Sequence, residues 1–153
     1  MSEYSAGEDP LSGLHVLEYP YRRSLGPVLS RFFTDLRDRK LTGIRDASGR
    51  VLVPPQEYDP ETAETLHEFV SVGPGGEVVS YTWVAEPRSK QPLDHPFAYA
   101  LIRLDGADAP MLHAVDAGEE SRISVGSRVR PRWAAEPVGS ILDLACFELE
   151  EEE

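Results

Sequence analysis

Cysteine is almost missing from this sequence of 153 residues, in which Cys146 is the only one. An internal disulfide needs two thiols, and a zinc site built from thiolates needs several, so the sequence excludes both. A chain without a disulfide framework is typical of the cytoplasm. We therefore expect a cytoplasmic protein that holds neither zinc nor another cofactor.

Long hydrophobic runs are missing too. A helix that crosses a bilayer needs about 20 consecutive apolar residues, and no run in the sequence approaches that length. The first residues, MSEYSAGEDP, lack the basic start and apolar middle of a secretory signal. These two absences predict a soluble protein without a membrane partner.

Basic residues are scarce. The chain has 15 Lys and Arg against 27 Asp and Glu, which gives a formal net charge of -12 at pH 7. Such a chain repels phosphate backbones and anionic membranes, so we do not expect a nucleic acid as a partner. The hydrophobic fraction of 41% is ordinary for a globular domain and argues against wholesale disorder.

Patterns that mark an active site are also absent. The sequence contains no phosphate-binding G-x-x-x-x-G-K-[ST], no dinucleotide-binding G-x-G-x-x-G after a strand, and no G-x-S-x-G. The glycine-rich stretch 73–76 lies between two strand-like patterns, which favours a hairpin turn over a phosphate cradle. Four histidines are scattered along the chain, at His15, His67, His95 and His113. The sequence therefore predicts a protein that is not an enzyme.

The clearest predicted element is an amphipathic helix that starts near Leu25. Pro27 suits its first turn, and Gly43 lies just past its end. Its apolar stripe has two interpretations, because a helix that docks on a partner and a helix that packs on its own domain use the same spacing. The predicted docking residues are Leu25, Leu29, Phe32, Phe33 and Leu36.

The next segment, 44–66, has the outline of a small zinc-binding knuckle. Ser48-Gly49 predicts a tight turn, the residues from Val51 form a second arm, and Pro54-Pro55 ends the pairing because proline has no N–H to donate. Asp59-Pro60-Glu61 has the composition of a helix start, so a helical turn is expected to run to about Leu66.

The rest of the chain reads as β structure. Segments 67–73 and 78–86 alternate around the turn PGGE and predict a hairpin, 97–106 and 111–118 predict a second pair, and 128–137 predicts a fifth strand. Five short strands after a helical arm favour a small Greek-key barrel of the OB-fold type. The predicted organisation is a flexible tail (1–13), an N-terminal helical arm (14–43), a degenerate ribbon (44–66), an OB-fold (67–147) and an acidic tail (148–153).

This order of parts resembles the DUF35 family. The resemblance covers roughly residues 20 to 135 and depends on the order and spacing of LTGIR, GRVLVPP, VVSYTWV, FAYALIRLDG and SVGSRVRPRW. It implies a rubredoxin-like zinc ribbon joined to an OB-fold, in a protein associated with acyl-CoA metabolism.

The zinc ligands of that family are replaced in this sequence. The family carries C-x-x-C before a G-R-V segment and C-P-x-C after P-P, and these positions fall here on Arg45 to Ser48, or with a small shift on Asp46, and on Asp59 and Thr62. We expect a metal-free ribbon in which hydrogen bonds of Asp59 take over the role of the metal. Ion pairs from Arg45 or Arg50 to acids of 59–64 would add to them.

The resemblance also implies a function. It predicts a non-catalytic subunit that docks on a thiolase-superfamily enzyme, such as a lipid-transfer-protein-like thiolase or aldolase acting on acyl-CoA from steroid side chains or fatty acids. The assembly would be a hetero-oligomer with two copies of each chain. The alternative is a free-standing module that binds acyl-CoA or lipid. The cations predicted to contact acyl-CoA are Arg22, Arg23, Arg39, Lys40 and Arg103, although Arg39 and Lys40 also suit the end of a helix dipole.

Overall fold

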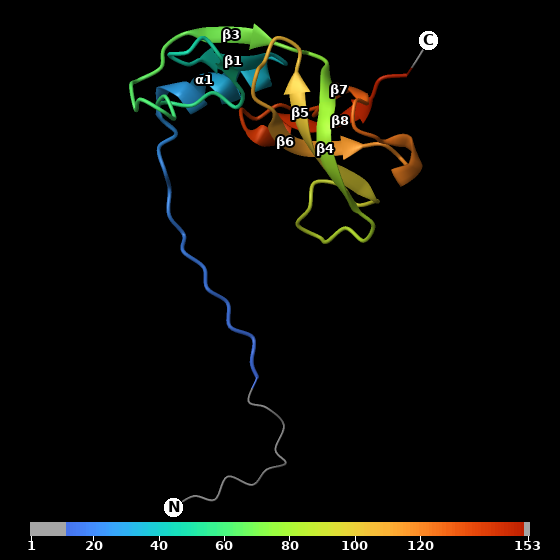
Figure 1. The fold of residues 1–153 in the computed structure, drawn as a ribbon. Helices are drawn as coiled ribbons and strands as arrows, with labels where there is room; N and C mark the ends of the chain where they lie inside the picture. Colours follow the sequence, from blue (N-terminus) through green and yellow to red (C-terminus); the bar gives the residue numbers. More distant parts are fainter. Residues whose placement is uncertain (1–11, 152–153) are drawn as a thin grey trace, which may run out of the picture.

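The computed structural model describes residues 12–151, which form one α-helix, two short 3₁₀ helices and eight strands. Figure 1 shows how these elements are arranged in space. The predicted tail at 1–13 lies almost entirely outside the described residues, and so does the end of the acidic tail at 148–153. The elements are α1 (Gly26–Arg37), β1 (Leu41–Arg45), β2 (Val51–Leu52), β3 (Phe69–Val72), β4 (Gly76–Val84), β5 (Phe97–Leu104), β6 (Met111–Asp116), η1 (Glu120–Arg122), β7 (Arg128–Trp133), η2 (Ile141–Asp143) and β8 (Leu144–Leu149).

Helix α1 forms where the apolar spacing predicts it, with Pro27 in its first turn. The helix ends earlier than expected. Arg39 takes a left-handed conformation (φ 59°), and the Lys40 N–H donates to the Asp35 carbonyl at 2.8 Å. Gly43, predicted as the stop, lies inside β1, where an added Cβ would meet the Leu52 carbonyl oxygen at 2.8 Å. Its role is therefore close packing in a strand.

The segment after α1 forms a three-stranded antiparallel sheet in the order β2-β1-β3. The predicted turn at Ser48-Gly49 joins β1 to β2, which pair at Ile44 with Leu52. Strand β3 then pairs with β1, with Leu41 opposite Val72. The prediction that 67–73 forms a hairpin with 78–86 is therefore wrong. Alternation along a strand indicates which face is buried and does not identify the neighbouring strand.

The larger sheet is a closed barrel in the order β4-β5-β6-β8-β7. Four antiparallel pairings and one parallel pairing, between β6 and β8, complete the ring. The mainly β fold class and the OB-fold prediction are confirmed. The fifth barrel strand is β8, however, since β3 belongs to the small sheet. Glu148 and Leu149, predicted as acidic tail, form the end of this strand.

One hydrophobic cluster joins the two sheets. Phe32 and Leu36 of α1 lie in the same buried cluster as Val51 of the small sheet and Ile102 and Phe147 of the barrel. Polar contacts reinforce the junction. The Asp108 carboxylate accepts from the Val51 N–H at 2.8 Å, and the Asp108 N–H donates to the Val51 carbonyl at 2.9 Å. The helix and the small sheet therefore pack against one end of the barrel as a continuous body (Figure 1).

Candidate partner interface

The stripe of α1 that was predicted to dock faces largely inward. Phe32 is 1% exposed and Leu36 is fully buried, both within the core of the chain itself. Their assignment as docking residues is therefore wrong. The physical reason is that apolar side chains of the small sheet and of one barrel end must be buried. In the described part of the chain, α1 is the one α-helix available to bury them. Phe33 is half-buried and packs against this core, and Leu29 is half-buried on the same helix.

Residues 12–25 lie outside that body. In Figure 1 they extend away from α1 as a long blue segment without helix or strand, so the helical part of the predicted arm begins at Gly26. This segment exposes six large apolar side chains, with exposed fractions from 44% to 94%. They are Leu14, Val16, Leu17, Tyr19, Tyr21 and Leu25. The prediction placed residues 14–25 in the helical arm, where the structure has no helix, and it did not single out these apolar side chains because they have no helical period.

The five cations predicted to contact acyl-CoA are not brought together. Arg22 and Arg23 precede α1, whereas Arg39 and Lys40 follow it. At 1.5 Å per residue, the helix between the two pairs separates them by about 18 Å. Arg103 lies on β5, where its guanidinium contacts the Glu77 carboxylate at 3.3 Å. The described residues therefore contain no single basic site made of these five.

Asp59 links the two loops of the small sheet. Its buried carboxylate accepts from the Ala47 N–H at 2.9 Å through Oδ2, and from the Glu61 and Thr62 N–H groups at 2.8 and 3.0 Å through Oδ1. These hydrogen bonds, that from Ala47 first, lower the pKa of Asp59. The hydrogen bond to Ala47 joins the loop around residues 45–48 to the loop that starts at Asp59. These are the two loops that a metal ion would join in a zinc ribbon.

Asp46 holds the first loop in a similar way. Its Oδ1 accepts from the Ser48 hydroxyl at 2.7 Å and from the Ser48 and Arg50 N–H groups, each at 2.9 Å. These contacts, led by the Ser48 hydroxyl, lower the pKa of Asp46. Two carboxylates, each accepting three hydrogen bonds, therefore lie at the positions where the resemblance predicts metal-binding pairs.

Other details of this segment differ from the predictions. A single turn follows Asp59 and ends at Ala63, which has a left-handed conformation (φ 61°), so the predicted helical turn to Leu66 does not form. Arg45 pairs with Glu68 at 3.0 Å instead of the acids of 59–64. Within residues 12–151, no three His, Cys, Asp or Glu side chains converge as a metal site.

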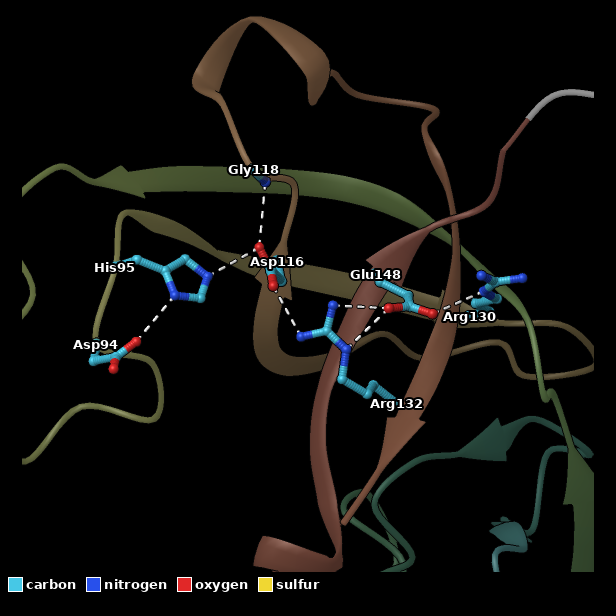
Figure 2. A network of polar contacts seen from close by, with 7 residues as sticks. All are labelled: Asp94, His95, Asp116, Gly118, Arg130, Arg132 and Glu148. Atoms are coloured by element: carbon cyan, nitrogen blue, oxygen red, sulfur yellow. Dashed lines mark hydrogen bonds and ion pairs between the residues drawn. The ribbon is translucent and has the colours of Figure 1, made fainter. Parts of the chain in front are cut away.

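A chain of ion pairs crosses the barrel surface, as Figure 2 shows. Asp116 contacts His95 at 3.1 Å and Arg132 at 2.8 Å, and Arg132 also contacts Glu148 at 2.8 Å. His95 is held on its other side by Asp94 at 3.1 Å. The contacts to Asp94 and Asp116 raise the pKa of His95. Sequence reasoning missed this network because it depends on strand register, although the alternating Arg128, Arg130 and Arg132 were a visible signal.

The network links β6, β7 and β8 through Asp116, Arg132 and Glu148, and it contains no Ser, Thr, Cys or Lys side chain that could act as a nucleophile. Burial disfavours the charged form of Asp116, but hydrogen bonds from Arg132 and His95 outweigh burial and lower its pKa. The hydrogen bond from Arg132 likewise lowers the pKa of Glu148. Both nitrogens of His95 contact carboxylates, Asp94 on one side and Asp116 on the other. In this arrangement neither nitrogen is directed at a side chain that could serve as a nucleophile.

His113 lies on β6 and Cys146 on β8, and both side chains are largely shielded from solvent. Burial lowers the pKa of His113, whose Nε2 donates to the Leu144 carbonyl at 2.8 Å. Cys146 is buried, and burial raises the pKa of its thiol. A surface hollow of about 950 Å³ beside the barrel has a mostly polar lining that suits water and ions. It is formed by Arg122, Ser124, Val125, Gly126, Ser127, Arg128, Leu149, Glu150 and Glu151.

Among the helices described, none has the length and apolar character required to cross a membrane.

A search among curated proteins finds no match to the sequence.

Residues 69–134 match the family model of the ChsH2 C-terminal OB-fold domain. A DUF35-family protein of unknown function from Sulfolobus solfataricus is similar in structure, with a TM-score of 0.59 and 21% identity over 81% of this chain and 84% of the other. A chain of the Ltp2-ChsH2(DUF35) aldolase is also similar, with a TM-score of 0.60 and 19% identity over 84% of this chain and 98% of that one. The family match covers the OB-fold region from β3 to β7, and the two solved structures show that this chain shares its fold with proteins described as DUF35.

Proposed function

We propose that this chain is a non-catalytic accessory subunit that docks on a thiolase-superfamily enzyme, such as a lipid-transfer-protein-like thiolase or aldolase. The observation that carries the proposal is the match of residues 69–134 to the ChsH2 C-terminal OB-fold domain. One chain of the Ltp2-ChsH2(DUF35) aldolase has a similar fold, and the similarity covers 84% of the present protein.

The side chains support an accessory role. Cys146 is buried with a raised thiol pKa, His113 is committed to a backbone carbonyl, and His95 is held between two carboxylates. An activated nucleophile needs an adjacent base that is free to take its proton, and none of these groups meets that condition. In this proposal the partner supplies the nucleophile and the base.

We further propose that the partner acts on an acyl-CoA from steroid side chains or fatty acids, in a cytoplasmic assembly with two copies of each chain. Of the five predicted cations, Arg39, Lys40 and Arg103 lie on the folded body and are the proposed contacts for the CoA phosphates. Arg22 and Arg23 lie on the extended segment, at the other end of α1.

Co-expression with the thiolase-superfamily protein encoded nearest to this chain tests the proposal. We expect the two to co-elute in size-exclusion chromatography with a mass that matches two copies of each. The partner should cleave or condense acyl-CoA faster in the complex than alone. A chain that elutes alone and binds acyl-CoA in calorimetry would favour the free-standing module, and turnover by the isolated chain would overturn the non-catalytic role.

A further inference from the structure

The extended segment 12–25 carries more exposed apolar surface than a soluble domain ordinarily leaves unused. Five of its large apolar side chains are more than half exposed, and they fall within the eight residues from Leu14 to Tyr21. Soluble monomers rarely expose contiguous apolar surface on this scale unless it binds something.

The segment has no support from its own domain within the described residues. Among residues 12–24, the hydrogen bond that the structure shows is internal, from the Tyr21 N–H to the Tyr19 carbonyl at 2.9 Å. Arg22 and Arg23 form no ion pair with any residue of 12–151. The five apolar side chains from Leu14 to Tyr21 are therefore left largely exposed beside the folded body.

The spacing of the side chains suits recognition in an extended form. In a fully extended chain, alternate residues project to the same side, so Leu17, Tyr19 and Tyr21 would share one side at intervals of about 7 Å once the turn closed by the Tyr21–Tyr19 hydrogen bond opens. Leu14 and Val16 occupy the other side. Pro20 restricts its own φ and keeps Tyr19 out of the helical region, which lowers the entropy lost when the segment is ordered.

Charge distinguishes this segment from the rest of the chain. It carries Arg22 and Arg23 against the single acid Glu18, within a protein whose net charge is -12. An acidic surface would repel the body of the chain and attract this segment. The segment thus complements an apolar groove with carboxylates at the end where Arg22 and Arg23 lie.

We propose that residues 12–25 are a docking arm, and that the arm binds an apolar groove with a carboxylate rim on the thiolase-superfamily partner. This inference rests on the proposed function and moves the docking site from the buried stripe of α1 to the extended segment. Leu17, Tyr19 and Tyr21 fill the groove, and Arg22 and Arg23 pair with the rim. Linear segments of this kind bind through a few side chains along an extended backbone.

The test compares two triple variants in the full chain. The first replaces the arm side chains by Leu17→Ser, Tyr19→Ser and Tyr21→Ser. The matched control changes three side chains of similar exposure elsewhere, by Leu112→Ser, Val125→Ser and Val138→Ser. Circular dichroism and thermal unfolding establish that both variants fold. Calorimetry then measures the dissociation constant with the thiolase-superfamily protein encoded nearest to this chain.

We expect the arm variant to bind at least 10-fold more weakly than the unmodified chain, and the control to bind within about twofold. Equal binding by the arm variant and the unmodified chain overturns the docking arm and leaves the proposed function standing. No binding by the unmodified chain overturns the proposed function, and the arm with it. If the arm variant binds the partner normally but no longer self-associates, the arm binds a second copy of this chain instead. If it binds the partner normally but no longer binds phosphatidylserine vesicles, the arm binds a membrane instead.

The charged end of the arm has its own test. Arg22→Glu together with Arg23→Glu places acids against the carboxylate rim, whereas Arg22→Ala with Arg23→Ala only removes the attraction. We expect the Glu pair to weaken partner binding more than the Ala pair, and the difference to shrink at high salt. Equal effects of the two pairs would contradict a carboxylate rim.

Discussion

The Asp59 carboxylate accepts a hydrogen bond from the Ala47 N–H at 2.9 Å and thereby joins two loops that are 12 residues apart in the chain. The same carboxylate accepts from the Glu61 and Thr62 N–H groups. In zinc ribbons, a metal ion joins the corresponding loops through thiolates. We propose that the Asp59 side chain, anchored in one loop and bonded to the backbone of the other, takes the place of the metal in this chain.

Replacing Asp59 tests this substitution directly. Asp59→Ala leaves three N–H groups without their acceptor and removes the link between the loops, so we expect the melting temperature to fall by about 5 °C or more. Glu61→Ala, at an exposed position of the same turn, is the control and should change it by less than about 2 °C. Thermal unfolding followed by circular dichroism measures both, and equal melting temperatures for the two variants would show that Asp59 is not the link.

Metal removal should leave the protein unchanged. Because hydrogen bonds of Asp46 and Asp59 hold the loops, we expect less than about 0.1 equivalent of zinc by elemental analysis of the purified chain. Treatment with EDTA should not shift the melting temperature. A zinc content near one equivalent would contradict the metal-free ribbon.

The two carboxylates also predict how stability depends on acid. Both have a lower pKa in the folded chain than the usual value of 3.8, so the unfolded chain takes up protons first as the pH falls. Their contribution to stability is present above about pH 3.8 and is lost as the pH falls through their folded pKa values. Urea unfolding from pH 6 to pH 2.5 should show this loss, and Asp59→Asn should make the curve shallower in that range. A curve unchanged by the substitution would contradict the role of Asp59.

His95 and His113 should titrate on opposite sides of the usual histidine value. Hydrogen bonds to Asp94 and Asp116 raise the pKa of His95 above 6.5, whereas burial lowers the pKa of His113 below it. The stabilisation from His95 is therefore complete below pH 6.5 and is lost as the pH rises through its folded pKa. NMR titration of the two rings measures both values. Asp94→Asn should lower the pKa of His95 and leave that of His113 in place, and a shift of both would indicate a general change in the fold.

Local patterns predicted the elements better than their arrangement. The spacing around Phe32 located α1, and Ser48-Gly49 located the turn between β1 and β2. The partner of Phe69–Val72 could not be predicted, because an alternating strand pairs equally well with either neighbour. Strand β8 was not predicted because the acidic residues from Glu148 are typical of a solvated tail. In the structure, Glu148 lies opposite Arg130 in the barrel. The ion pairs of Figure 2 depend on the same register.

The neighbouring side chains Phe32 and Phe33 give the last prediction, because they separate packing from docking. Phe32 is 1% exposed within the main core, whereas Phe33 is half-buried at its edge. We expect Phe32→Ala to lower the free energy of unfolding by about 3–5 kcal/mol, as is usual for a phenylalanine removed from a core, and Phe33→Ala to lower it by less. Denaturant unfolding measures both values. A chain that loses little stability with Phe32→Ala but binds its partner poorly would return this side chain to the interface, and α1 would then be the docking element in place of residues 12–25.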